Sequence, residues 1–204
     1  MSVGGANRRP GRLDDLRREA ASCRACPLWK NATQTVFGEG PSDAEIILVG
    51  EQPGDKEDRE GRPFVGPAGL LLDRALAEAG VDRGRVYVTN AVKHFKFEPR
   101  GKRRLHKRPN AGEVDACRWW LDRERAIVKP RVIVALGATA ARGVVGRALT
   151  ISSVRGEILM GPDDSRVVVT IHPSYLLRLR DDASKEREYN GLVDDLRRCA
   201  TLLT

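Results

Sequence analysis

The chain has 204 residues, a formal net charge of +8 and 41% hydrophobic residues, an ordinary composition for a globular protein. This length suffices for one well-buried domain and is too short for two large ones. No apolar run approaches transmembrane length, and residues 1–11 lack the apolar core of a secretory signal. We therefore expect a disordered lead-in over 1–11 and a single cytoplasmic, monomeric domain over 12–204.

The first half of the chain contains two helical and two strand patterns. In chain order, they predict a helix over 13–21, a strand over 46–49, a helix over 67–79 and a strand over 86–88. The first strand is a continuous apolar run that ends at Gly50, as expected for a strand buried on both faces. The segment after Gly50 is polar and is interpreted as a loop.

The second half of the chain repeats this alternation after a basic loop. In chain order, it predicts a helix over 111–128, a strand over 132–136, a helix over 138–145, a strand over 167–171 and a helix over 184–202. Asn110 and Glu113 are spaced as the partners of a helix capping box. The last helix contains Asn190–Gly191, which predicts a weak interruption.

Strands that alternate with helices predict a three-layer αβα fold around a four-stranded parallel sheet. Ligands bind such sheets beyond the carboxyl ends of the strands. Glu51 and Gln52 follow the first strand, Asn90 follows the second and His172 follows the fourth. These positions predict one pocket that contains all four side chains.

The excess positive charge is concentrated in residues 93–108. This window has eight Lys or Arg residues and one acid, Glu98, and so carries seven of the eight net charges. Such a concentration favours contact with a phosphate-bearing polymer. His106 ends the run Lys102–Arg103–Arg104–Leu105–His106 and places a nucleophilic imidazole within the basic loop.

The residues around the predicted pocket allow both structural and chemical roles. Glu51 is a candidate general base, and Asp55 could hold a water molecule. The acids at 57, 58 and 60 are interpreted as a solvated face. Phe64 could seal the core or stack on a base, and a neutral His172 could either cap a helix or stabilise a developing anion.

Four cysteines are present, and only Cys23 and Cys26 form a close pair. In a reducing cytoplasm this spacing favours zinc or an iron–sulfur cluster over a disulfide. Cys117 lies on the helix after the basic loop, and a fourth ligand could be Cys199, His94 or water. Cys199 alternatively fits a buried structural thiol.

Together these residues resemble the iron–sulfur members of the uracil-DNA glycosylase superfamily, called family 4, and among them the UdgX group. The resemblance spans nearly the whole chain. The matching segments are Cys23–Leu28, Gly50–Glu57, Pro63–Gly69, Thr89–Phe95, Lys102–His106, Leu136–Ala138 and His172–Ser174. The basic segment that ends in His is specific to the UdgX group, in which Ile usually stands at the position of Leu105.

The resemblance implies a pocket for a flipped-out uracil in DNA repair. Phe64 is expected to stack on the uracil ring, Asn90 to read its edge, the backbone around Gln52 to contact its carbonyls and His172 to lie near O2. Base flipping costs little in single strands, so single-stranded DNA is the expected preference. The phosphates are expected to be held by Lys102, Arg103 and Arg104.

The resemblance also implies a [4Fe–4S] cluster. Ordinary family 4 members have a Cys where this chain has His94. The simplest ligand set is therefore Cys23, Cys26, His94 and Cys117. The alternative leaves the fourth iron with an exogenous ligand.

The UdgX resemblance implies that His106 attacks C1′ of deoxyuridine, so that the protein becomes covalently bound to DNA in a single turnover. Glu51 would take or orient the imidazole proton, and Asp55 would position a competing water or orient the loop. The alternative is a multiple-turnover family 4 glycosylase that releases uracil and leaves an abasic site. A third reading is a non-catalytic cluster or zinc protein that binds nucleic acid.

Overall fold

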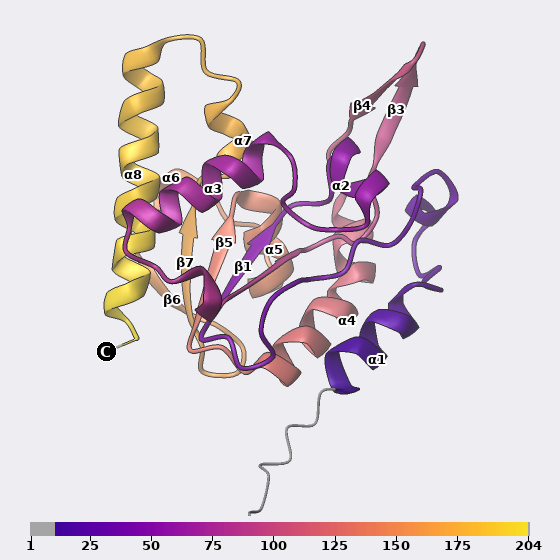
Figure 1. Cartoon of the computed structure of the whole chain (residues 1–204), viewed down its shortest axis with the longest axis horizontal. Coiled ribbons are helices and arrows are strands. Elements are labelled where there is room, and N and C mark those ends of the chain that lie inside the picture. The colour runs from indigo at the N-terminus through magenta and orange to yellow at the C-terminus, as the bar shows by residue number, and fades with distance from the viewer. Residues whose placement is uncertain (1–10, 204) are drawn as a thin grey trace, which may run out of the picture.

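The computed structural model describes residues 11–203 (Figure 1). The expected lead-in over 1–11 lies outside the described residues except for Gly11, which begins the first helix. Within the described residues, no helix is long and apolar enough to cross a membrane.

A five-stranded sheet lies at the centre, in the strand order β2-β1-β5-β7-β6. Its strands are β1 (Ile46–Gly50), β2 (Val86–Asn90), β5 (Val132–Leu136), β6 (Ile158–Met160) and β7 (Arg166–Thr170). The four predicted strands pair in parallel, as expected. The expected number of four was one too low, because β6 adds an antiparallel edge strand beside β7.

Helices cover both faces of the sheet and complete the three layers (Figure 1). One face is covered by α3 (Pro67–Glu78), α7 (Pro173–Leu176) and α8 (Asp182–Thr201). The other is covered by α1 (Gly11–Ala20), α4 (Ala111–Val128), α5 (Ala138–Val145) and α6 (Ile151–Val154). Successive strand residues point to opposite faces, so Ile46 and Leu48 enter one core while Ile47 and Val49 enter the other.

The helix ends follow the local sequence. Asn110 Oδ1 accepts a hydrogen bond from the Glu113 amide at 2.9 Å, and Glu113 Oε2 accepts one from the Asn110 amide at 2.7 Å, which confirms the predicted capping box of α4. The predicted interruption at Asn190–Gly191 is wrong, because α8 continues through both residues. Leu192, Val193 and Leu196 are buried there and hold the helix against the sheet.

The basic segment is a β-hairpin rather than the expected loop. Strands β3 (Phe97–Arg100) and β4 (Arg103–His106) pair antiparallel, with Phe97 opposite His106. The turn uses Gly101 at φ 58°, a left-handed conformation that glycine adopts without strain. The hairpin projects from the body near the carboxyl ends of the parallel strands (Figure 1).

Three short elements complete the chain, none of them predicted. They are the 3₁₀ helices η1 (Pro27–Lys30) and η2 (Arg83–Arg85) and the helix α2 (Asp55–Glu60). The last of these follows β1 and packs beside the hairpin through Asp55 and Asp58, which both pair with Arg104.

Candidate active site

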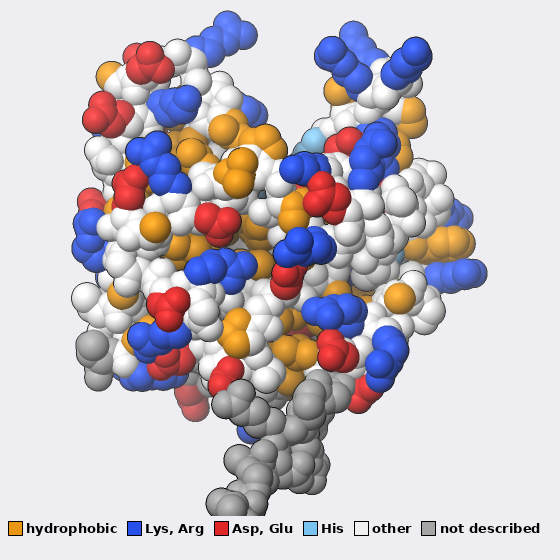
Figure 2. Space-filling model, in the orientation of Figure 1, with side chains coloured by type: hydrophobic (Ala, Val, Ile, Leu, Met, Phe, Trp, Pro, Cys, Tyr) orange, Lys and Arg blue, Asp and Glu red, His pale blue; other side chains and the backbone are white. Residues whose placement is uncertain are grey.

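A cavity of about 480 Å³ opens beyond the carboxyl ends of the parallel strands. Figure 2 shows the surface hollowed between the hairpin and the end of the molecule that carries α7 and the start of α8. Six of the predicted site residues line the cavity: Glu51, Gln52, Phe64, Asn90, His106 and His172. The fold thus brings together residues that lie more than 100 positions apart in the chain.

The imidazole of His106 faces the carboxylate of Glu51 in this cavity. Nε2 of His106 lies 3.4 Å from Oε1 of Glu51. The other oxygen, Oε2, accepts a hydrogen bond from the hydroxyl of Thr139 at 2.6 Å, which orients the carboxylate. Partial burial lowers the pKa of His106 below 6.5, although Glu51 opposes the shift, and Arg178 lowers this pKa further. The ring is therefore neutral at pH 7 and retains a nucleophilic lone pair.

His172 is held as a neutral hydrogen-bond donor. It is the N-cap of α7, and its Nδ1 accepts a hydrogen bond from the Ser174 amide at 3.1 Å. Burial lowers the pKa of His172 to about 4, and the charges of Arg178 and His106 add to this effect. Because Nδ1 accepts, the single proton of the neutral ring is on Nε2. That N–H group is available to a ligand in the cavity.

Phe64 and Asn90 are packed closely against the end of β1. The rings of Phe64 and His172 lie 6.2 Å apart between centroids, with an interplanar angle of 22°. A side chain at Gly50 would place its Cβ 2.3 Å from Asn90 Oδ1 and 2.7 Å from Phe64 Cζ, so only glycine fits there. A Cβ at Gly69 would lie 1.7 Å from the carbonyl oxygen of Phe64. These two glycines set the shape of the cavity wall.

The side chain of Gln52 ties the end of β1 to the base of the hairpin. Its Nε2 donates to the carbonyls of Lys96 and Lys107 at 3.1 and 3.0 Å. Its Oε1 accepts from the Lys96 amide at 3.0 Å. The amide side chain is thereby fully used, which leaves the backbone at Gln52 as the part that can contact a ligand.

Asp55 and Arg104, both predicted site residues, do not line the cavity. Arg104 bonds Asp55 and pairs with Asp58 at 2.6 Å, and its guanidinium lies over the rings of Phe95 and Phe97 at 5.4 and 5.0 Å. Burial alone would raise the pKa of Asp55, but hydrogen bonds from Arg59 and Arg104 outweigh burial and lower this pKa.

The neighbouring carboxylate of Asp58 is fully buried, so its assignment to a solvated face was wrong. It accepts hydrogen bonds from the Thr33 amide at 3.0 and 3.1 Å as well as from Arg104. Burial is possible because these donors satisfy the charge. Arg104 and Asp58 therefore anchor the hairpin that carries His106.

The turn of the hairpin carries the cations of the basic segment that lack an ion pair among the described residues. Arg100, Lys102 and Arg103 form no ion pair with any residue from 11 to 203. Other cations of the basic segment are paired, as Lys107 is with Glu98 at 2.7 Å. The positive end of the hairpin stands beside the hollow in Figure 2. Lys102 and Arg103 therefore lie exposed at the turn of the hairpin, whereas Arg104 pairs with the buried Asp58.

Two charged residues of the cavity were not among the predicted site residues. Arg178 lines the cavity, and its Nη1 donates to Ser174 Oγ at 3.2 Å. Glu57 accepts hydrogen bonds from the amides of Gly54 and Gly66 at 3.1 and 2.8 Å and so joins two wall segments. The segment around Glu57 contained a usable signal, because glycine-rich turns expose amides that need an acceptor. Nothing local to Arg178 indicated its position.

The predicted cluster ligands gather on the α1–α4 side of the molecule. Cys26 and Cys117 are buried in one apolar core, and Cys23 packs against it. Cys23 and His94 line the same cavity of about 150 Å³. Burial raises the pKa of Cys117 to about 12, and the nearby Cys26 and Cys23 contribute to the shift. Within residues 11–203, however, no three His, Cys, Asp or Glu side chains are arranged closely enough to hold a metal ion.

His94 nevertheless has the electronic state of a metal ligand. The hydroxyl of Thr35 donates to the Ala20 carbonyl at 3.0 Å, so it accepts from His94 Nε2 at 2.9 Å. Burial lowers the pKa of His94, and the neutral ring then has its lone pair on Nδ1. Nδ1 is buried without a hydrogen-bond partner among the described residues. A buried lone pair in a cavity that Cys23 also lines fits a metal or cluster in the chemistry of its donors.

Residues 37–197 match the uracil DNA glycosylase superfamily. The chain belongs to this superfamily. It is 45% identical over 171 residues to the type-4 uracil-DNA glycosylase of Thermotoga maritima, across 83% of this chain and 85% of the relative. It is 36% identical over 191 residues to the type-4 enzyme of Sulfurisphaera tokodaii, across 86% and 84% of the two chains. It is 38% identical over 184 residues to the type-4 enzyme of Pyrobaculum aerophilum, across 85% and 90%.

Proposed function

We propose that this protein excises uracil from DNA and that His106 becomes covalently bound to C1′ of the deoxyuridine sugar. Superfamily membership supports the substrate class. The shape and polarity of the cavity support a flipped-out base, with Phe64 at its face and the Asn90 amide at its edge. The backbone at Gln52 would contact the uracil carbonyls.

The bond cleavage leaves negative charge on uracil and positive charge on the sugar. The Nε2–H group of His172 is suited to donate to uracil O2 as that oxygen becomes anionic. It is already in the donor tautomer and needs no proton transfer before the reaction. Aromatic contact with Phe64 holds the ring while the bond between N1 and C1′ lengthens.

The single observation that carries the covalent step is the contact of His106 with Glu51 at 3.4 Å. A lone pair of the neutral imidazole forms the new bond to C1′, and the bond from C1′ to uracil N1 breaks. The resulting imidazolium loses its N–H proton to Glu51, and the uracil anion takes a proton from solvent. General-base help of this kind is typically worth about 10²–10⁴-fold.

The product has no evident route of release, because the uncharged imidazole of His106 is a poor leaving group from C1′. We therefore infer a single turnover and place the protein in the UdgX group. In this proposal Asp55 orients the hairpin through its ion pair with Arg104. Any water held by Asp55 would lie outside the cavity lining.

A multiple-turnover glycosylase is the second candidate, and the relatives favour it. All three relatives compared above have the name of type-4 uracil-DNA glycosylases. In this candidate, water activated by Glu51 attacks C1′ and His106 only lines the cavity. The half-exposed position of His106 beside the general base favours the covalent reaction over this alternative.

DNA would cross the cavity mouth as a single strand bound to a protein monomer. Lys102 and Arg103, free of ion pairs within residues 11–203, would contact its phosphates. Arg178 also lines the cavity and would add positive charge near the reacting sugar. Unpaired strands require no base-pair disruption, which is the physical reason for the expected preference.

We further propose that Cys23, Cys26, His94 and Cys117 hold a [4Fe–4S] cluster. This ligand set is supported by the buried lone pair on His94 Nδ1, by the cavity that His94 shares with Cys23, and by the packing of all three thiols at one core. When bound, the cluster would supply a structural link and the positive charge that releases the thiol protons. His94 is twelve residues before His106, so the link would join the N-terminal segment to the base of the hairpin.

The stoichiometry of uracil release tests the proposal. Excess uracil-containing single-stranded DNA is incubated with a known amount of protein, and free uracil is measured over time. We expect release to stop at about one uracil per active protein molecule. Continued linear release beyond that amount would favour the multiple-turnover candidate, whereas release of none would reject uracil excision altogether.

A further inference from the structure

A buried ion pair contacts the backbone of Asn90, one of the residues that line the cavity. Nζ of Lys93 is 2.6 Å from Oε2 of Glu124, and both side chains are fully buried. Lys93 follows β2 by three residues, and Glu124 reaches it from the C-terminal half of α4. Charged side chains are almost never fully buried unless they are paired, so this position requires a reason.

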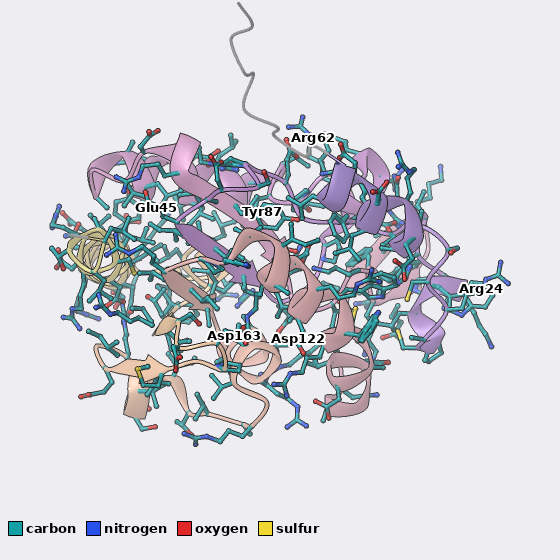
Figure 3. All side chains as sticks on the ribbon, turned by 90° about the horizontal axis from the view of Figure 1, so that it is seen from below. Arg24, Glu45, Arg62, Tyr87, Asp122 and Asp163 are labelled. Atoms are coloured by element: carbon teal, nitrogen blue, oxygen red, sulfur yellow. The ribbon has the colours of Figure 1, made fainter. Side chains whose placement is uncertain are left out.

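The ion pair is part of a network in which every strong donor is used. Nζ of Lys93 donates to Glu124, to the hydroxyl of Thr89 and, at 2.9 Å, to the main-chain carbonyl of Asn90. Glu124 also accepts hydrogen bonds at 3.0 Å from the Gly38 amide, the Tyr87 hydroxyl and the Thr89 hydroxyl. Figure 3 shows Tyr87 inside the molecule, between the layers. Burial raises the pKa of Tyr87, and Glu124 adds to the shift, so the phenol remains a donor.

The same turn is fixed from its other side by the end of β1. The amides of Ala91 and Val92 donate to the carbonyls of Gly50 and Glu51 at 2.9 and 3.0 Å. The Lys93 amide donates to Sγ of Cys117 at 3.2 Å. Residues 90–93 therefore join the edge-reading amide, the general base and a proposed cluster ligand.

We propose that the Lys93–Glu124 pair is a positioning device that holds the Asn90 amide in register with the uracil edge. This inference rests on the proposed function. The Lys93 ammonium fixes the carbonyl of Asn90, and the peptide plane in turn fixes the direction of its side chain, which lines the cavity. A displacement of about 1 Å at such a position can cost about 10²-fold in rate.

Stability alone is a weak reason to keep such a pair. The desolvation of two charges offsets much of their attraction, and buried pairs can often be replaced by neutral residues without loss of stability. A role in positioning gives a different expectation, because it makes uracil recognition depend on the ammonium even when the fold does not. The two roles are therefore separable by experiment.

The test uses the double variant Lys93→Met/Glu124→Gln. Replacing Lys93 alone would leave a buried carboxylate without its partner and endanger folding. The double variant removes both charges, while the glutamine side chain introduced on α4 keeps an acceptor for the Gly38 amide and the Tyr87 hydroxyl. The hydrogen bond to the Asn90 carbonyl is lost.

Arg125→Met is the matched control. Arg125 is the next residue on α4, its side chain is also buried at 2% exposure, and it pairs with Asp122 and Asp163. Figure 3 shows these two carboxylates close together, and Asp163 lies before β7, at the opposite end of the sheet from the cavity. The control thus removes a buried cation from the same helix without touching the turn that holds Asn90.

Three quantities are measured on each full-length protein: the melting temperature, inhibition by free uracil and the single-turnover rate of uracil release. We expect the double variant to remain folded, to bind uracil at least about tenfold more weakly and to release uracil at least about tenfold more slowly. The control is expected to retain wild-type uracil inhibition whatever its melting temperature.

The inference is overturned if the double variant retains wild-type uracil inhibition and rate, or if both variants lose them in proportion to their melting temperatures. Failure of the proposed function has a different signature, because the wild-type protein itself would then release no uracil. Activity in the wild type with an unchanged double variant would reject only the positioning role.

Discussion

Nε2 of His106, the last residue of β4, lies 3.4 Å from Oε1 of Glu51, the residue that follows β1. The two side chains come from elements 55 positions apart and meet only because the hairpin folds back over the end of the sheet. Gln52 and Arg104 fix that approach from either side of the pair. An imidazole and a carboxylate this close at a cavity are the arrangement that the proposed covalent chemistry requires.

Glu51→Gln should slow the cross-link while leaving the fold intact. The amide keeps the size of the carboxylate and still accepts the Thr139 hydrogen bond, but it cannot take a proton. We expect the rate of adduct formation to fall by about 10²-fold or more, as for loss of a general base. Stopped reactions on denaturing gels give the rate. The control Glu98→Gln removes an exposed carboxylate of the same hairpin and should leave the rate of adduct formation unchanged.

Cross-linking should persist to mildly acidic pH. The pKa of His106 is lowered below 6.5, and the neutral ring is the proposed nucleophile, so we expect reactivity to be lost as the pH falls through this lowered value. We expect a nearly constant rate between pH 8 and 7 and a half-maximal rate at a pH below 6.5. In the proposed mechanism uracil binding needs neutral His172, whose pKa is lowered to about 4, so this binding should survive further into acid. A rate that already declines between pH 8 and 7 would contradict a lowered pKa.

Adjacent arginines of β4 should give opposite phenotypes. Arg104→Ala leaves the buried Asp58 carboxylate without its charged partner, which we expect to cost about 3 kcal/mol of folding free energy. Arg103→Ala should change stability by less than about 0.5 kcal/mol and reduce the salt dependence of DNA binding by about one unit of slope. Thermal melting checks the change in stability, and DNA binding at several salt concentrations checks the change in slope. Equal loss of stability in the two variants would contradict the anchoring role of Arg104.

The purified protein should absorb at about 400 nm and contain iron and sulfide, as expected for a [4Fe–4S] cluster. Cys117→Ala should abolish this absorbance. Cys199→Ser is the matched control, because Cys199 is equally buried but lies on α8, in the other core. His94→Cys should retain the cluster, since it restores the residue usual in family 4. Absorbance that survives Cys117→Ala would remove that residue from the ligand set.

Much of the fold could be predicted because each element carries its own signal. The buried strands are short runs of Val, Ile and Leu that end at Gly or polar residues, and α4 begins at its predicted capping box. Parallel topology then placed Glu51, Asn90 and His172 at one edge of the sheet. Gathering these residues in one cavity needed no knowledge of the side-chain packing.

The remaining features depend on contacts between distant segments. Strand β6 has three residues and is formed mainly by pairing with β7, and β3 contains Pro99, which argues against a strand. The local sequence predicts that Asp58 is a surface acid. It is buried because Arg104, 46 residues away in the chain, pairs with it. Arg178 enters the cavity only because α7 turns the chain after His172. Periodicity and composition do not encode such pairings.

The most direct test of the covalent role of His106 is a denaturing gel of protein incubated with uracil-containing single-stranded DNA. We predict a stable shifted band for the wild type and none with thymine in place of uracil. His106→Ser should form no band while it still releases some uracil. Free uracil in many-fold excess over protein with no shifted band from the wild type, or a band that persists in His106→Ser, would contradict the assignment of His106 as the nucleophile.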